Sequence, residues 1–128
     1  MNINDSFAKK VTVLGREYSI NVYTAEEDKY FKEHSDTYGY CDYIDHKIAL
    51  LDASTKDAYK SETEDYILKA MKETLRHEII HAFLDESGLC SSSLALGSIP
   101  WALNEEMVDW FAIQGPKILE AWKKAKAL

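Results

Sequence analysis

The chain has 128 residues, about the size of one domain, of which 46% are hydrophobic and 29% charged. This composition excludes a disordered tail, a collagen-like fibre and a coiled-coil rod. The formal net charge of −7 argues against a strongly basic nucleic-acid surface, and no apolar run is long enough to span a membrane. Two cysteines are too few for a disulfide scaffold and the N-terminus has no secretion signal, so we expect a single cytoplasmic domain over residues 1–128.

The first part of the chain has the pattern of short β-strands. Three segments are expected to form strands: 11–14, 18–22 and 46–51. They are rich in β-branched, aromatic or aliphatic residues, and the second alternates apolar and polar side chains as a half-buried strand does. Gly15-Arg16 predicts a hairpin turn between the first two. Residues 25–36 predict a short surface helix or a loop, and residues 39–45 predict a turn.

A long helix is expected in the middle of the chain. Ser61 and Glu64 have the spacing of a capping box, and the helical pattern that follows runs to about Ser87. Gly88 is a typical residue at the C-terminal end of a helix. Residues 79–84 are almost entirely apolar, so we interpret this as the central helix of the domain.

Two further helices are expected after a loop-like segment, residues 89–103. The first runs from about Trp101 to Gln114, where Gly115-Pro116 predicts its end, and a short last helix reaches about Ala127. Strands first and helices afterwards predict an α+β domain, in which a small antiparallel or mixed sheet packs on a helical layer.

One motif in the central helix points to chemistry: His77-Glu78-Ile79-Ile80-His81, or HExxH. Residues four apart lie one above the other on a helix, so both imidazoles can reach one cation, and zinc favours such nitrogen ligands. Glu78 is rotated by about 100° from His77, beside the metal, where it can take a proton from a water molecule and return it to the leaving group. The alternative, two unligated histidines in a core, is disfavoured because burying them in so apolar a turn is costly.

A third protein ligand is expected on the second helix. Glu105 and Asp109 share a face, on which the small residues Ala102 and Ala112 allow close approach to the central helix. This arrangement favours Glu105 as the third ligand and Asp109 as the acceptor for the second ring N–H of a ligating histidine. Glu106 points about 100° away and is the second choice. For both glutamates the alternative is an acidic first turn that complements the helix dipole. Four large side chains should point into the core: Leu103, Met107, Trp110 and Phe111.

HExxH followed by NExxxD on a later helix resembles the gluzincin zinc peptidases, the group that includes thermolysin. The matching residues are His77, Glu78, His81, Asn104, Glu105 and Asp109. The resemblance implies that Glu105 is the third zinc ligand and that Asp109, with Asn104 beside it, supports the ligands from outside. The small size and the order of strands, HExxH helix and glutamate helix also resemble the minigluzincins, which include the ImmA/IrrE-like peptidases of phages and mobile elements.

These residues predict a Zn²⁺-dependent metallopeptidase that cleaves an intracellular protein or peptide, with Glu78 as the general base. The resemblance implies a regulator as the substrate, and the family layout suggests residues 46–51 as the sheet edge along which an extended substrate pairs. One alternative is a zinc protein of the same fold that binds a partner or senses metal without hydrolysis. A helical interaction module without metal is a third reading. No nucleic-acid or membrane partner is expected.

The weaker candidates are side chains that could assist the site. A tyrosine or histidine could donate to the developing oxyanion, and five stay open: His34, Tyr38, Tyr40, Tyr43 and His46. Cys41 and Cys90 have no CxxC partner and are interpreted as ordinary thiols. Residues 90–93 join the two metal-bearing helices and could form a lid or a plain connector.

Overall fold

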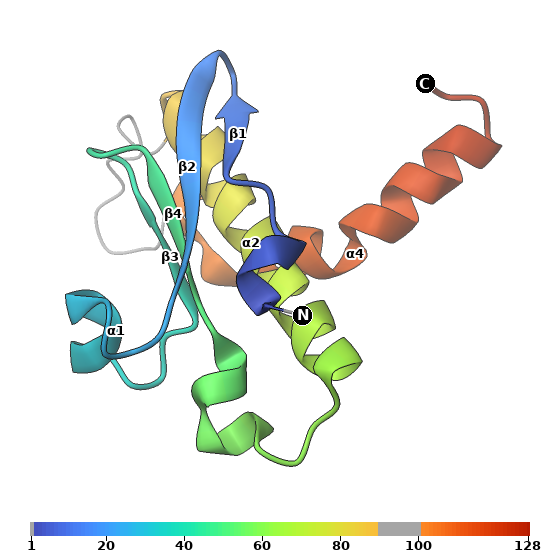
Figure 1. Cartoon of the computed structure of the whole chain (residues 1–128). Coiled ribbons are helices and arrows are strands. Elements are labelled where there is room, and N and C mark those ends of the chain that lie inside the picture. Colours follow the sequence, from blue (N-terminus) through green and yellow to red (C-terminus); the bar gives the residue numbers. More distant parts are fainter. Residues whose placement is uncertain (1, 90–100) are drawn as a thin grey trace.

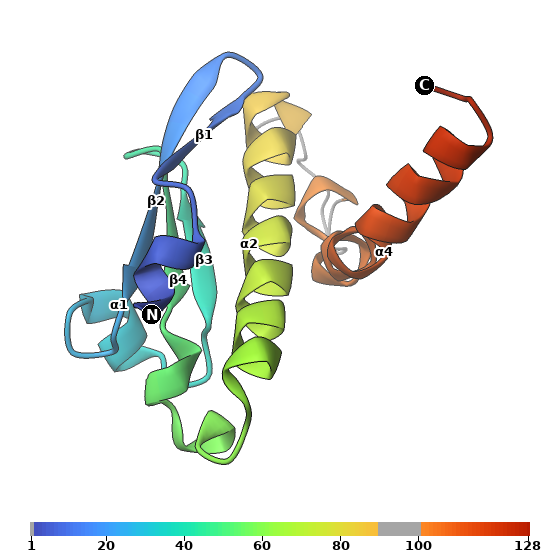
Figure 2. The same ribbon diagram turned by 45° about the vertical axis from the view of Figure 1, so that its right-hand side comes forward.

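The computed structural model describes residues 2–89 and 101–128, so Cys90 and the segment 90–93 lie outside the described part of the chain. A twisted β-sheet covers one side of the long helix α2, and helix α4 lies on the other side of α2 (Figures 1 and 2). Helix α2 is therefore the central element, as its apolar sequence predicts. Among the described residues, no helix is long and apolar enough to cross a membrane.

The sheet is mixed and has four strands in the order β1-β2-β4-β3. The strands are β1 (Lys10–Val13), β2 (Arg16–Tyr23), β3 (Gly39–Asp42) and β4 (Lys47–Leu51). β2 and β4 pair in parallel, whereas the two outer pairs are antiparallel. The predicted α+β class with a small mixed sheet on a helical layer is confirmed.

The hairpin between β1 and β2 turns one residue earlier than predicted. Its turn is Leu14-Gly15, and Arg16 already pairs with Val13. Both turn residues have positive φ angles, 48° and 84°, as a tight two-residue hairpin turn requires. Of the two possibilities left open for residues 25–36, a short helix forms over part of the segment, α1 (Lys29–Glu33), which is capped by the Asp28 side chain.

The prediction of a turn over residues 39–45 is wrong for its first half, because Gly39–Asp42 forms the strand β3. The real turn starts at Asp42, whose carboxylate accepts hydrogen bonds from the amides of Ile44 and Asp45, each at 3.0 Å. β3 pairs with β4, so β4 lies inside the sheet and β3 is one of its two edge strands in the described chain. The expectation that residues 46–51 form the sheet edge is therefore also wrong.

β4 is buried on both faces, which explains its uninterrupted apolar sequence. Ile48 and Leu50 pack in the core that α2 covers. Ala49 and Leu51 pack on the opposite face against Phe31 of α1. The sheet is thus packed on both faces. Helix α2 covers the face that carries Ile48 and Leu50, and α1 packs on the face that carries Ala49 and Leu51.

Helix α2 (Glu64–Glu86) begins two residues later than a cap at Ser61 would require. Thr63 is the N-cap, and its hydroxyl accepts a hydrogen bond from the Tyr66 amide at 3.1 Å. Both residues are suitable caps, and Thr63 is followed directly by two acidic residues, Glu64 and Asp65, that complement the helix dipole. The predicted end is confirmed, because Gly88 takes a φ of 84°, in the left-handed region that glycine adopts without strain.

Helix α4 (Glu105–Lys124) follows a single 3-10 turn over Trp101–Leu103. It therefore begins later than predicted, and it continues through Gly115-Pro116 as one helix where we expected two. A proline in a helix removes its own N–H bond to the carbonyl four residues earlier, here that of Ala112. Arg76 of α2 replaces this donor, because its Nε donates to the Ala112 carbonyl at 2.6 Å. A contact distant in sequence thus overrides the local signal to stop.

The expected inward face of α4 is only partly correct. Ala102, Val108 and Ala112 are buried, and the predicted small-residue face is indeed the one that contacts α2. Three of the four large side chains expected in the core are exposed instead: Leu103, Trp110 and Phe111. Trp110, for example, keeps 54% of its surface accessible. α4 packs through its small residues, and in Figures 1 and 2 its far side faces away from α2 and the sheet.

Candidate metal centre

His77 and His81 occupy successive turns of α2 and converge at one point. Their Nε2 atoms lie 3.1 Å apart, and the two rings meet edge to face. His81 is only 8% exposed. Burial chiefly lowers the pKa of His81, although the nearby Glu105 carboxylate opposes this. A neutral imidazole at this position is the form that can bind a metal ion.

Glu105, the first residue of α4, brings its carboxylate to the same point. One oxygen lies 2.7 Å from His81 Nε2 and the other 3.2 Å from His77 Nε2. Glu106, the second choice from sequence, lies elsewhere: it lines a groove on α4 together with Met107, Trp110 and Ile113. Of the two adjacent glutamates, Glu105 is the one that reaches the histidines.

The spacing of these donor atoms fits a tetrahedral zinc ion. With metal–ligand bonds of 2.0 to 2.1 Å, ligand atoms at the corners of a tetrahedron lie about 3.3 Å from one another. The two Nε2 atoms lie 3.1 Å apart, and the two oxygens of the Glu105 carboxylate lie 2.7 Å from His81 Nε2 and 3.2 Å from His77 Nε2, so the three side chains approach one another at about that separation. The Glu105 side chain is 66% exposed, so the side of the site away from the helices is open to solvent. The donor set, two imidazoles and a carboxylate, is also one that zinc accepts.

Asp109, one turn after Glu105 on α4, holds His77 from outside. Its carboxylate lies 2.7 Å from His77 Nδ1. Because a carboxylate can only accept, Nδ1 carries the proton, and Nε2 is the His77 ring atom left to bind a metal ion. His81 Nδ1 is buried without a hydrogen-bond partner among the described residues.

Asn104 acts on the helix rather than on the histidines. It is the N-cap of α4, and its side chain accepts a hydrogen bond from the Met107 amide at 2.9 Å. This bond satisfies one of the free amides at the start of the helix, directly before Glu105. Asn104 therefore fixes where the helix that carries Glu105 and Asp109 begins.

Glu78 is the buried acid of the site, only 6% exposed, with one oxygen 4.0 Å from His77 Nε2. The pKa of its carboxyl group is raised to about 7: burial is the main cause, His77 opposes it, and the carboxylates of Glu105 and Asp109 add to the rise. A carboxyl group with a pKa near neutrality both takes up and releases protons readily at physiological pH. The ligand atoms of His77, Glu78 and His81 all lie within 4.8 Å of one another.

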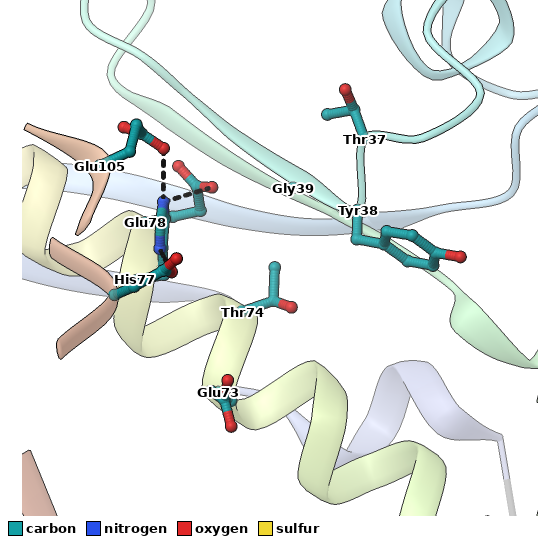
Figure 3. Close-up of a pocket in the computed structure, with 9 residues that line it drawn as sticks. Thr37, Tyr38, Gly39, Glu73, Thr74, His77, Glu78 and Glu105 are labelled. Carbon is teal, nitrogen blue, oxygen red and sulfur yellow. Dashed lines mark hydrogen bonds and ion pairs between the residues drawn. The ribbon is translucent and has the colours of Figure 1, made fainter. Parts of the chain in front are cut away.

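A cleft of about 270 Å³ opens beside these residues (Figure 3). Its walls come from α2, from the start of α4 and from the chain leading into β3, and its lining residues are Thr37, Tyr38, Gly39, Glu73, Thr74, His77, Glu78, Glu105 and Asp109. The β3 wall stands close to α2 because residue 39 has no side chain. A Cβ there would lie only 2.6 Å from Thr74 Cγ2 and 3.3 Å from Glu78 Cγ.

Sequence reasoning missed this β3 wall entirely. Thr37, Gly39 and Thr74 carry no motif, and they meet only when the edge strand packs on α2. The lone glycine between Tyr38 and Tyr40 is the one available signal, and it equally fits a turn.

The five possible oxyanion donors are spread over the molecule. Tyr38 lines the cleft, but its ring points away from His77 and Glu78 (Figure 3). The Tyr40 hydroxyl donates to Asp28 at 2.8 Å, and the His34 ring stacks on Tyr30. His46 lies beside Glu86 at the C-terminal end of α2. Tyr43 follows β3 in a turn and is not among the described cleft residues.

Comparisons with protein families, curated proteins and solved structures give no match for this chain. The class of this protein is therefore defined by its fold and by the geometry of its site. The protein is an α+β protein whose central helix carries a His-Glu-His group, His77, Glu78 and His81, that could hold a metal ion.

Proposed function

We propose that this protein is a zinc-dependent peptidase of the gluzincin type. His77, His81 and Glu105 hold the metal, and Glu78 is the general base. One observation carries the proposal: a carboxylate from α4 meets two imidazoles from α2 at the spacing of tetrahedral ligands, with a buried acid beside them. The resemblance of HExxH and NExxxD to the gluzincin motifs supports the same assignment.

Zinc held by these three side chains would supply Lewis acidity, which acidifies water and polarises a peptide carbonyl. Glu78 takes a proton from the attacking water and passes it to the leaving amine. Asp109 keeps His77 in the tautomer that faces the metal. A purely structural zinc site has four protein ligands and no use for a buried acid, so Glu78 favours a catalytic role over a structural one.

The edge strand β3 indicates an extended polypeptide as the substrate. The Leu51 amide donates to the Tyr38 carbonyl at 2.9 Å, which places residue 38 in a hydrogen-bonded pair with β4. By the alternation of an antiparallel ladder, the amide and carbonyl of Gly39 then face the outer edge of the sheet. A peptide that adds as a further strand there would run along the cleft past Glu78 and His77. A regulatory protein, the substrate that the resemblance implies, would have to present such an extended segment.

One observation favours the alternative, a zinc-holding protein that binds a partner without hydrolysis. Large apolar side chains along α4, the helix that carries Glu105, are exposed: Trp110, Phe111, Ile113, Leu119 and Trp122. Exposed apolar side chains gathered on one element are typical of surfaces that contact other proteins. Such a surface is equally compatible with a peptidase that recognises a folded substrate, so an activity measurement separates the two functions.

Removal of the metal tests the proposal directly. The protein is treated with 1,10-phenanthroline, dialysed and mixed with a library of natural peptides whose cleavage is counted by mass spectrometry. Cleavage should fall by at least about 100-fold, since the Lewis acid contributes several kcal/mol, and one equivalent of Zn²⁺ should restore it. Cleavage that survives chelation would contradict a metal mechanism. A zinc-loaded protein that cleaves nothing would favour the alternative.

A further inference from the structure

Beside the contacts of the candidate metal ligands themselves, a further hydrogen bond ties α4 to α2. Pro116 has no N–H, so the Ala112 carbonyl, one turn earlier, loses its usual partner within the helix. Ala112 is buried, and a buried carbonyl without a donor is costly. Arg76 supplies the donor across the interface, with its Nε 2.6 Å from the Ala112 oxygen. Arg76 is the residue directly before His77.

We infer that Arg76 and Pro116 act together as a positioning pair, which sets where Glu105 and Asp109 stand relative to the two histidines. Ala112 lies one turn after Asp109 and two turns after Glu105, on the same face of α4. The bond thus joins the ligand-bearing face of α4 to the turn of α2 that carries His77. The inference rests on the metal site proposed above, and it assigns a role to two residues outside that site.

The α2–α4 contact needs such a fixed point because its apolar part is small. The fully buried residues of α4 are only Val108 and Ala112, joined by Ala102 in the preceding turn. Small side chains allow close approach but interlock weakly, so they do little to stop one helix sliding along the other. The C-terminal part of α4 leads away from α2 (Figure 2), and residues 119–128 are all exposed. The short hydrogen bond from the Arg76 guanidinium to the Ala112 carbonyl is directional, so it fixes the position of α4 along α2, which this packing does not.

Pro116 is the residue that makes the hydrogen bond from Arg76 necessary. With any other residue at 116, the amide of that residue would donate to the Ala112 carbonyl inside the helix. Arg76 would then share an acceptor that is already satisfied, and the bond between the helices would matter less. The two residues should therefore depend on each other: loss of Arg76 should do harm only where Pro116 is present.

A matched pair of substitutions isolates the donor from the charge. In Arg76→Gln, the amide nitrogen stands the same number of bonds from Cα as Arg Nε, so the donor is kept while the charge is lost. Arg76→Met has a similar length and no donor. Each is made in the natural chain and together with Pro116→Ala. Two quantities are measured: the Kd for Zn²⁺ by competition with a chelator, and the Tm of the metal-free protein.

In the natural chain, Arg76→Met should weaken Zn²⁺ binding by about 10- to 100-fold, the range for residues that orient metal ligands. It should also lower the Tm by about 5 °C, because a buried carbonyl is left without a donor. Arg76→Gln should leave both values nearly unchanged. In the Pro116→Ala background, Arg76→Met and Arg76→Gln should give the same Kd and the same Tm. The backbone amide of residue 116 then satisfies the Ala112 carbonyl, which also keeps the Arg76→Met protein folded.

Two results would overturn the inference. If Arg76→Gln is as damaging as Arg76→Met, the charge of Arg76 matters and the bond does not. If Arg76→Met is equally damaging with and without Pro116, the two residues are not coupled. A failure of the metal site itself is recognised separately, because the unsubstituted protein would then bind no Zn²⁺. The Tm values of the metal-free proteins would still show whether Arg76 and Pro116 are coupled.

Discussion

Glu78→Gln is expected to keep its zinc and to lose about 10²- to 10⁴-fold in kcat/KM on peptide substrates, the usual contribution of a general base. Glutamine fits the same buried space between α2 and β3 but cannot accept a proton from water. Because Glu78 is not one of the three proposed ligands, the zinc content should stay near that of the natural chain. Zinc is measured by mass spectrometry of the metal, and kcat/KM on one peptide chosen from the library.

Glu73→Gln is the control for this prediction. Glu73 lies on the same helix and lines the same cleft, but it is exposed and is not in the His-Glu-His group. Its substitution removes one carboxylate charge from the cleft without touching the proposed base, so activity should stay close to that of the natural chain. An active Glu78→Gln protein would disprove the general-base role. An equal loss in both variants would indicate that the cleft only needs negative charge.

Glu105→Ala is expected to weaken Zn²⁺ binding by more than about 100-fold, beyond the range seen for residues that merely orient ligands. Its carboxylate is the only donor from α4 placed within 3.2 Å of both histidine Nε2 atoms in the described structure. Without it, two imidazoles hold the ion, and a site with two protein ligands is incomplete for zinc. The Kd is measured by competition with a chelator of known affinity.

Glu106→Ala is the matched control, because the two glutamates are adjacent in the first turn of α4. Both substitutions remove one negative charge near the helix N-terminus, so any effect on the helix dipole is nearly the same. Glu106 lines the groove beside Trp110 instead of the cleft, and its loss should leave the Kd almost unchanged. If the Glu106 variant loses zinc and the Glu105 variant keeps it, the assignment of the third ligand is wrong.

The parts of the site that depend on helical spacing could be predicted from sequence. His77 and His81 converge because residues four apart on a helix share a face, and the same rule pairs Glu105 with Asp109. Ala102 and Ala112 correctly indicated which face of α4 approaches α2. Each of these inferences depends only on the presence of a helix and on its period of 3.6 residues, and both α2 and α4 form.

The features that sequence reasoning missed depend on contacts between distant segments. Residues 39–42 have the composition of a turn and become a strand only because β4 pairs with them. Pro116 signals a helix end, yet α4 continues because Arg76, far away in sequence, satisfies the Ala112 carbonyl. Trp110 was expected to point into the core from the side of α4 opposite its small residues, but no further layer of the described chain covers that side.

A crystal structure of the protein grown with Zn²⁺, with anomalous data at the zinc edge, is the most direct test of the proposed metal centre. We predict one anomalous peak bound by Nε2 of His77, Nε2 of His81 and the Glu105 carboxylate, at the usual 2.0 to 2.2 Å. One position should stay open to solvent on the side of Glu78. Zinc bound elsewhere with these three side chains apart, or a fourth protein side chain in the open position, would contradict a catalytic zinc centre here.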